Sequence, residues 1–438
     1  MKIAIIGSGI SGLGAALALS TEHDVRVFER DTRVGGHAHT IDAMFGDVAQ
    51  PVDTGFIVYN YRNYPNLTAM FDHLGVPTKW SDMSFGFSLD DGRFEYACDN
   101  LSTIFAQRWR ALDPRFLNTF REILRFTKVA PRDLESGAAD GLSLGAWLKA
   151  RRFSRWFRER FLLPMGGAIW STRLGDVLDF PAESFIRFFV NHDLMTGLDP
   201  SMRWRTVDGG SREYVRRIVT NLGPRIVVGR GVAEVDRSGL RPLLKFEDGE
   251  AESFDAVVIA THGPQAHAML DKGAVEQRAL LSNFRTSRNR AVTHSDPALM
   301  PKRRKVWSSW NFLSNGMDDD RDRPAPVTYW MNRLQSIDES RPLFGSLNPA
   351  REPDPALVHA DLSYDHPLFD AASFRAQAGM DQIQGRDNVW YAGAWLGYGF
   401  HEDGLRSGLR VANALGTRPE WVKDVGAPLE ARVLYAAE

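Results

Sequence analysis

The chain has 438 residues, long enough for two domains that each bury a hydrophobic core. Its formal net charge of −2 offers no basic surface to a nucleic acid, and no apolar run approaches the roughly 20 residues of a membrane span. A single cysteine excludes an internal disulfide and a zinc-thiolate site, so we expect a cytoplasmic protein that binds neither metal nor nucleic acid.

The first motif is a glycine-rich turn between a strand predicted over residues 3–6 and a helix predicted over residues 13–19. Gly7, Gly9 and Gly12 form G-x-G-x-x-G: the first glycine permits the turn, the second lets backbone approach a pyrophosphate, and the third lets helix and strand pack closely. The helix start then offers free N–H groups to phosphate oxygens. A secretory signal, the alternative, needs an uninterrupted apolar core, which these glycines interrupt.

A second predicted strand, residues 24–29, ends in Glu29, which lies 17 residues after Gly12. A carboxylate at this place accepts hydrogen bonds from the ribose hydroxyls of an adenosine. The doublet Gly35-Gly36 follows, where a Cβ would again hold the backbone away from a ligand. The residues that we assign to this part of a dinucleotide site are Gly7, Gly9, Ile10, Ser11, Gly12, Glu29, Arg30, Gly35, Gly36 and His37.

Four ordered segments resemble the FAD-binding sequence of the amine oxidase superfamily, which includes monoamine oxidases, protoporphyrinogen oxidases, carotenoid desaturases and fatty-acid double-bond isomerases. They are the N-terminal motif with its glycine doublet, VDGGSREYVRRI at 207–218, FDAVVIATHGPQA at 254–266 and NVWYAGAWLGYGFHEDGLRSGLRVANAL at 388–415. The resemblance implies noncovalent FAD, because the last segment contains no cysteine. The further cofactor contacts that it implies are Val232, Ala260, Thr261, Gly393, Ala394, Gly404 and Leu405.

Two positions depart from the family pattern. His37 follows the doublet where relatives usually have Arg or Lys, and Ala394 stands where they commonly have an acidic residue. We expect Glu402, Asp403 or a water to replace that acid. The last segment predicts a helix that begins near Gly404, whose first N–H groups would face the flavin N1 and C2 carbonyl.

The resemblance implies an α/β fold, in which a Rossmann-like FAD-binding domain is interleaved with an α+β substrate domain. The expected division is 1–90, 205–290 and 385–418 for the FAD-binding domain, 91–204 and 291–384 for the substrate domain, and 419–438 for a loose C-terminal tail.

The first insertion contains a predicted helix at 114–130 and an arginine-rich segment at 147–170. In the second segment, arginines alternate with Trp156, Phe157 and Phe161. This pattern indicates a solvated face over an ordinary core, with a helix at a membrane surface as the alternative.

Three residues are candidates for proton transfer. Amine oxidases of the superfamily commonly place a lysine near the flavin N5, but the corresponding place in this chain falls near His294 to Asp296, which weakens an amine-oxidising function. Lys302 and Lys305 follow closely in the sequence and are the alternative residues for this place. His294 and Asp296, two apart, would form an imidazole–carboxylate pair on a strand, or a surface hydrogen-bonded pair. His401 is expected in a loop that faces the flavin or the substrate.

THSDPALMP together with YGFHEDGLRSG is also similar to a narrower bacterial group of FAD-binding proteins, often encoded near cyclopropane-fatty-acid-synthase-like methyltransferases. This similarity implies an FAD-dependent oxidoreductase that abstracts hydride from unsaturated or methyl-branched fatty acyl chains, a desaturase. The expected partner is a lipid substrate, with peripheral contact at the inner face of the membrane as an option. A redox-neutral double-bond isomerase, an amine or amino-acid oxidase and a flavin-bound protein without turnover remain alternatives.

Overall fold

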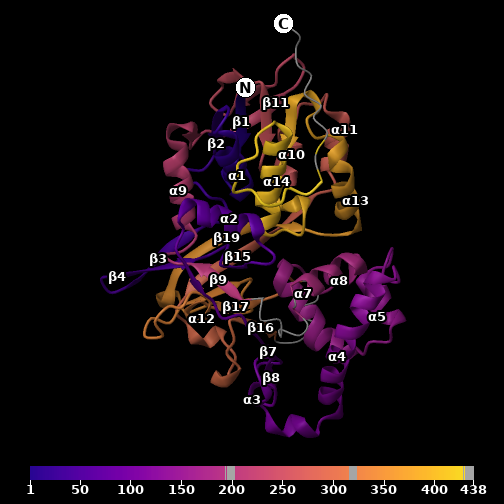
Figure 1. Cartoon of the computed structure of the whole chain (residues 1–438). Helices are drawn as coiled ribbons and strands as arrows, with labels where there is room; N and C mark the ends of the chain where they lie inside the picture. Colours follow the sequence, from indigo (N-terminus) through magenta and orange to yellow (C-terminus); the bar gives the residue numbers. More distant parts are fainter. Residues whose placement is uncertain (193, 195–202, 315–322, 428, 430–438) are drawn as a thin grey trace.

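The computed structural model describes residues 1–192, 194, 203–314, 323–427 and 429. Figure 1 shows an upper part, which holds the N-terminus and a parallel sheet, and a lower part, which holds a larger mixed sheet and a group of helices.

The upper sheet consists of five parallel strands. In spatial order they are β10 (Ile226–Val227), β2 (Asp24–Phe28), β1 (Lys2–Ile6), β14 (Ala256–Ile259) and β20 (Val389–Tyr391). Strands β1 and β14 are continuous apolar runs, because strands of such sheets are buried on both faces. Ile3 and Ile5 pack into one core, and Ala4 and Ile6 pack into another. The predicted Rossmann-like α/β fold is confirmed.

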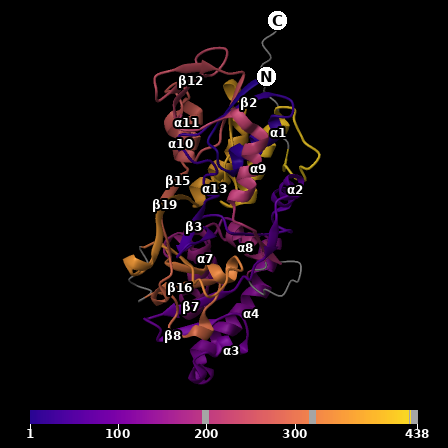
Figure 2. The same cartoon turned by 90° about the vertical axis from the view of Figure 1, so that its left-hand side faces the viewer.

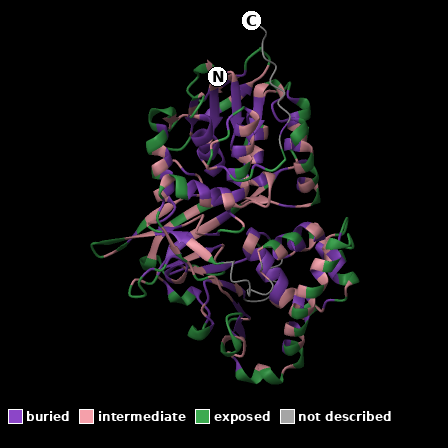
Figure 3. Ribbon diagram, viewed as in Figure 1, coloured by how far each residue is buried: buried purple, intermediate pink, exposed green. Residues whose placement is uncertain are grey.

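Helices cover both faces of this sheet. One face carries α1 (Ile10–Leu19), α2 (Pro65–Leu74), α9 (Arg212–Leu222) and α14 (His401–Ala414); the other carries α10 (Gly263–Met269), α11 (Val275–Leu281) and α13 (Ala371–Gly379) (Figure 2). A small antiparallel sheet of β11 (Val232–Asp236), β12 (Leu243–Phe246) and β13 (Ala251–Ser253) joins the second face. In Figure 3 the parallel strands are buried between these layers.

Helix α14 begins three residues before the predicted start near Gly404. The carboxylate of Asp403 accepts hydrogen bonds from the backbone N–H groups of Tyr398 and Phe400, each at 3.0 Å. An acidic side chain in the first turn stabilises free amide groups there, so the helix already begins at His401.

The lower part contains a seven-stranded mixed sheet. In spatial order its strands are β19 (Val358–Leu368), β15 (Arg285–His294), β18 (Phe344–Leu347), β17 (Val327–Trp330), β16 (Trp310–Ser314), β7 (Phe85–Leu89) and β8 (Phe94–Ala97). Strand β7 therefore pairs here, although it precedes the predicted domain boundary at residue 90. Two smaller sheets connect the parts: the hairpin β3 (Thr40–Phe45) and β4 (Val48–Asp53), and the group β5 (Val58–Asn60), β9 (Trp204–Val207) and β6 (Thr78–Trp80). Helix α12 (Met331–Leu334) follows β17.

The remaining helices pack around an aromatic core at the lower right of Figure 1. They are α3 (Leu101–Ile104), α4 (Pro114–Glu135), α5 (Leu144–Ala150), α6 (Arg155–Phe157), α7 (Leu163–Trp170) and α8 (Ala182–Asn191), with a π-helical turn at Arg158–Leu162. The helix predicted over 114–130 is confirmed and continues to Glu135.

Residues 147–170 do not form one helix. The chain breaks after α5, and Ser154 starts α6 by accepting a hydrogen bond from the Phe157 N–H at 3.2 Å. Phe157 and Phe161 are buried in the aromatic core, and Trp156 is half-buried against it. This burial favours a solvated arginine face over an ordinary core. No helix among the described residues has the length and apolar character needed to cross a bilayer.

The described part of the predicted tail is not loose. Val422 and Val425 are buried in the same core as α1 and α2. The Asn66 side chain accepts hydrogen bonds from the backbone N–H groups of Lys423 and Asp424, both at 3.0 Å, and thereby fixes the segment to α2. Residues 428 and 430–438 of the predicted tail lie outside the described residues.

Candidate cofactor site

The glycine-rich turn lies at the carboxyl end of β1, where such folds bind their ligands. Gly7 has a φ of +100°, and at Gly12 an added Cβ would lie 2.0 Å from the Gly7 carbonyl oxygen, so both places require glycine. At Gly9, by contrast, no atom lies within 4 Å of the position of a Cβ. Helix α1 begins there without a side-chain cap or an acidic residue in its first turn. The backbone at Gly9, Ile10 and Ser11 therefore leaves an open cradle that fits a pyrophosphate.

Glu29 is held beside this cradle at the end of β2. Its Oε2 accepts hydrogen bonds from the N–H and hydroxyl of Ser8, at 2.9 and 2.5 Å, and its Oε1 accepts one from the Asp31 N–H at 3.0 Å. A carboxylate has about four acceptor positions, so capacity remains for a ribose hydroxyl. The neighbouring Arg30 is mostly exposed and pairs with Glu247 at 2.8 Å; its role as a cofactor contact stays a prediction.

The second glycine motif lies against the first. A Cβ on Gly36 would come within 3.1 Å of the Gly9 Cα, and the Gly35 N–H donates to the Ser8 carbonyl at 3.1 Å. The predicted doublet and turn thus form one surface.

Helix α14 approaches the same surface from the other end of the chain. A Cβ on Gly404 would lie 2.9 Å from Ile10 Cγ2, and one on Gly408 would lie 2.2 Å from the Ser11 carbonyl oxygen. These glycines let the start of α14 pack directly on the start of α1, so that Leu405 is buried between them.

The loops after β14 and β20 are joined to each other. The Trp395 indole N–H donates to the Thr261 carbonyl at 2.9 Å, and the Gly393 N–H donates to the Ser407 hydroxyl at 2.8 Å. Predicted contacts Ala260, Thr261, Gly393 and Ala394 therefore follow neighbouring strands at one edge of the sheet. Val232 begins β11 opposite Phe246, two residues after Arg230, whose backbone N–H donates to the Glu29 carbonyl at 2.9 Å; its role as a cofactor contact stays a prediction.

The carboxylates expected to replace an acid at position 394 also hold parts of the protein, and the replacement of that acid by one of them or by a water stays a prediction. Glu402 accepts hydrogen bonds from the Asn66 N–H and side-chain amide and from the Leu67 N–H, at 2.7 to 3.0 Å, and so caps α2. Burial raises the pKa of Glu402 to about 7. Asp403 caps its own helix, as described above.

A cluster of histidines lies next to the glycine doublet. The ring centroid of His37 lies 5.5 Å from those of His262 and His366 and 5.1 Å from that of Tyr364. Its Nε2 atom is buried and has no hydrogen-bond partner among the described residues. Burial first, and then the neighbouring imidazoles, lower the pKa of His37 well below its usual value, and burial lowers that of His366 to about 4. These rings are therefore neutral at pH 7.

Sequence reasoning selected His37 and missed His262, Tyr364 and His366. The last two lie on β19 and are brought into place by pairing with β15, which the sequence does not reveal. His262 carried an available signal, because it directly follows Thr261 in the third motif. No group of three or more His, Cys, Asp or Glu side chains in the described part of the chain is arranged to hold a metal ion.

His401 is the first residue of α14 rather than a loop residue, because Asp403 starts the helix early. Its ring stacks on Phe56, with centroids 3.9 Å apart and planes at 10°, and its Nε2 lies 2.8 Å from the Tyr214 hydroxyl. Burial lowers the pKa of His401 to about 3.

The predicted pair of His294 and Asp296 does not form. His294 Nδ1 accepts a hydrogen bond from the backbone N–H of Asp296 at 3.1 Å, and Nε2 lies 2.8 Å from the Ser346 hydroxyl. The Asp296 carboxylate accepts from the N–H groups of Ala298 and Asp354 instead, at 2.8 and 3.0 Å. Strand β15 ends at His294, so the alternation of strand side chains does not extend to Asp296. Both residues are buried rather than on the surface.

Comparison with known proteins identifies the family. The family model for flavin containing amine oxidoreductases matches residues 10–310. A provisionally named flavin-containing monoamine oxidase of Mycobacterium tuberculosis, AofH, is 27% identical over 284 residues, which cover 61% of this chain and 58% of that relative. The match thus spans less than two thirds of the relative's length.

Two solved structures share the fold. A CLA-producing fatty acid isomerase from P. acnes superposes with a TM-score of 0.67 at 15% identity, over 93% of this chain and 96% of the other. A cyclohexylamine oxidase from Brevibacterium oxydans superposes with a TM-score of 0.66 at 17% identity, over 94% and 98%. The matches confirm the predicted superfamily and its flavin cofactor, and they agree with the predicted enzyme class. The chain belongs to the family of flavin-containing amine oxidoreductases.

Proposed function

We propose that the protein is an FAD-dependent oxidoreductase that removes hydride from an apolar fatty acyl chain, and that it desaturates unsaturated or methyl-branched chains. The observation that carries the proposal is the aromatic surface beside the C-terminal flavin motif, which we define as the contact of Trp170 and Phe188 with Tyr398 and Phe400. The Trp170 indole N–H donates to the Tyr398 carbonyl at 3.2 Å, and Phe188 stacks on Phe400 with centroids 4.9 Å apart. Helices α7 and α8 thus meet the motif through hydrocarbon surface, which favours an apolar substrate.

The charges around the motif argue against an amine substrate. An ammonium group needs a carboxylate partner, and Asp53, Glu402 and Asp403 would each have to share its carboxylate with hydrogen-bond donors of the protein. Asp53 accepts from Ser211, Thr40 and Gln335, and the other two cap helices. Strand β15 also contains no lysine, the residue that amine oxidases of the superfamily commonly place near the flavin N5.

Bound FAD supplies the hydride acceptor. The backbone at Gly9 would hold its pyrophosphate and Glu29 its ribose, while the aromatic surface of α7 and α8 would exclude water from the acyl chain. His401 is the remaining candidate for proton transfer. When its Nε2–H donates to the Tyr214 oxygen, Nδ1 is free to accept a proton. With a pKa of about 3 it is a weak base, which suffices for the acidic proton next to a substrate cation.

The test is anaerobic reduction of the purified flavoprotein. We expect oleate or a methyl-branched acid of similar length to bleach the visible flavin absorbance, and benzylamine and putrescine to leave it unchanged. A product lighter by two hydrogens identifies a desaturase, whereas a product of unchanged mass identifies a double-bond isomerase. Bleaching by the amines alone would refute the acyl proposal and favour amine oxidation.

A further inference from the structure

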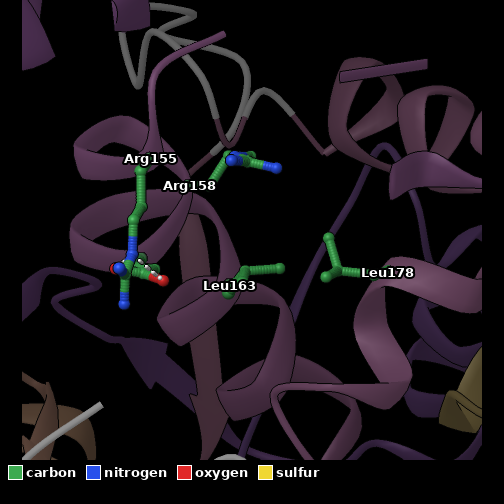
Figure 4. A pocket seen from close by; sticks show the side chains of 5 residues that line it. Arg155, Arg158, Leu163 and Leu178 are labelled. Carbon is green, nitrogen blue, oxygen red and sulfur yellow. Dashed lines mark hydrogen bonds and ion pairs between the residues drawn. The ribbon is translucent and has the colours of Figure 1, made fainter. Parts of the chain in front are cut away.

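A cavity lies in the helical group, apart from the candidate cofactor site. It has a volume of about 290 Å³ and is lined by Arg155, Arg158, Glu159, Leu163 and Leu178 (Figure 4). These residues come from α6, the π-helical turn, the start of α7 and the turn at 176–179. The lining combines charged side chains on one wall with leucines on the other.

The two arginines differ in their partners. Arg155 Nε lies 2.7 and 2.8 Å from the two carboxylate oxygens of Glu159, so this pair is neutral overall. The side chain of Arg158 makes no hydrogen bond or ion pair with any other described residue, and its Nε is buried. In Figure 4, Arg158, Leu163 and Leu178 extend toward a common space, while the end of Arg155 turns away from it. Among the described residues, the Arg158 guanidinium therefore has no carboxylate partner.

The backbone at Arg158 is also unusual. The π-helical turn of Arg158–Leu162 interrupts the series of α-helices, and such turns occur frequently at functional sites. A buried N–H group without a partner lowers stability unless a ligand satisfies it, so native proteins rarely retain one without a role. The charge, the unsatisfied donor and the turn coincide at a single residue.

We propose that this cavity binds the oxyanion of an acyl substrate, a carboxylate or a phosphate ester, through Arg158. A guanidinium binds either group through two N–H donors, and Leu163 and Leu178 would contact the first carbons of the chain. This inference rests on the proposed function for the identity of the substrate. To the proposed function it adds the place that would bind the polar end of the substrate.

The position of the cavity also indicates which part of the chain would react. Helix α7 runs from Leu163 at the cavity to Trp170, whose indole binds the Tyr398 carbonyl beside the flavin motif. At 1.5 Å per residue these two residues are about 10 Å apart along the helix. An acyl chain anchored at Arg158 would therefore present carbons well removed from its head group to the flavin.

The experiment measures equilibrium binding of decanoate, decyl phosphate and methyl decanoate to the oxidised flavoprotein. The wild type should bind one of the two anions at least tenfold more tightly than the uncharged ester. Arg158→Gln should weaken that anion about tenfold to hundredfold, as expected for one charge-assisted hydrogen bond, and leave the ester unchanged. Arg158→Lys keeps the positive charge but loses the paired N–H donors of the guanidinium, so its affinity for the anion should lie between those of the wild type and Arg158→Gln. The matched control is Arg121→Gln, an exposed arginine on α4, which should have no effect.

Preference for decanoate identifies a free acid as the ligand, and preference for decyl phosphate identifies a phospholipid head group. Equal binding of ester and anions by the wild type, or unchanged anion affinity in folded Arg158→Gln, would overturn the proposal. If Arg158→Gln does not fold, the wild-type ratio and Arg158→Lys decide. If anions bind through Arg158 but no acyl chain reduces the flavin, the proposed desaturase function is refuted and the proposed oxyanion site stands. If the acid and the ester reduce the flavin equally well, with or without Arg158, the oxyanion site is refuted and the proposed function stands.

Discussion

The substitution Gly9→Ala separates cofactor binding from folding. In the protein alone, Gly9 has a φ of −69° and a ψ of 177°, which alanine adopts freely, and its Cβ would meet no atom within 4 Å. The free energy of unfolding of the flavin-free protein should therefore stay the same, or rise by about 0.4–1 kcal/mol because the unfolded chain loses freedom. With FAD, the added methyl group would occupy the space of the pyrophosphate.

Loss of one charge-assisted hydrogen bond costs about 1.5–3 kcal/mol, so the Kd for FAD should rise about 10- to 150-fold. Gly12→Ala is the contrasting variant, because its Cβ would lie 2.0 Å from the Gly7 carbonyl oxygen and should destabilise the fold itself. FAD titration of the flavin-free proteins and urea unfolding measure the two effects separately. Wild-type FAD affinity in Gly9→Ala would show that the phosphates lie elsewhere.

Three further predictions concern single side chains. Glu29→Ala should weaken FAD binding by about 1–3 kcal/mol through loss of the ribose contact, and unchanged affinity in a titration would remove Glu29 from the site. Burial keeps His401 neutral with a pKa of about 3, whereas the unfolded chain takes up its proton near about pH 6.5, so its contribution to stability is present above that pH and is lost as the pH falls toward 3. His401→Phe, which retains a ring against Phe56, should reduce the pH dependence of urea unfolding between about pH 6 and 4 by about 1 kcal/mol per pH unit, and an unaltered slope would contradict the shift. His294→Gln should leave FAD affinity and the rate of flavin reduction within about twofold of the wild type while lowering the melting temperature, since loss of a buried hydrogen bond costs about 1 kcal/mol; a selective loss of the reduction rate would restore His294 as catalytic.

The parts of the site that the sequence predicted depend on local geometry. Gly7, Gly9 and Gly12 serve a turn between a strand and a helix that follow each other directly, and Glu29 ends the next strand of the same sheet. The backbone requires glycine at positions 7 and 12, Gly9 leaves room for a ligand, and Glu29 supplies a carboxylate at the end of the next strand. These residue types stand at fixed spacing within the first βαβ segment, so spacing alone identifies them.

The parts that the sequence missed depend on pairing between distant segments. His366 lies opposite Ser287 and Tyr364 lies opposite Asn289, and a shift of one residue in this pairing would turn both side chains to the other face. The error at His294 and Asp296 has a local origin, because β15 ends at His294 and the alternation of strand side chains does not continue over the next two residues. The early start of α14 depends on a single side chain, Asp403, whose capping role the sequence did not indicate.

The electrostatics of the candidate cofactor site and of the cavity at Arg158 differ, which indicates separate roles within the proposed reaction. Near the flavin motif the imidazoles of His37, His366 and His401 are neutral at pH 7, because burial opposes their protonation. A guanidinium without a carboxylate partner among the described residues lies instead at Arg158, in the cavity before α7. A charged head group is stabilised at Arg158 and not among the neutral imidazoles near the flavin motif. A hydrocarbon chain carries no charge, so it can lie near the flavin motif without a desolvation cost. Such an arrangement would orient an amphipathic acid in one direction, with its oxyanion at Arg158 and its middle carbons at the cofactor, whereas a short amine would find a partner at neither end.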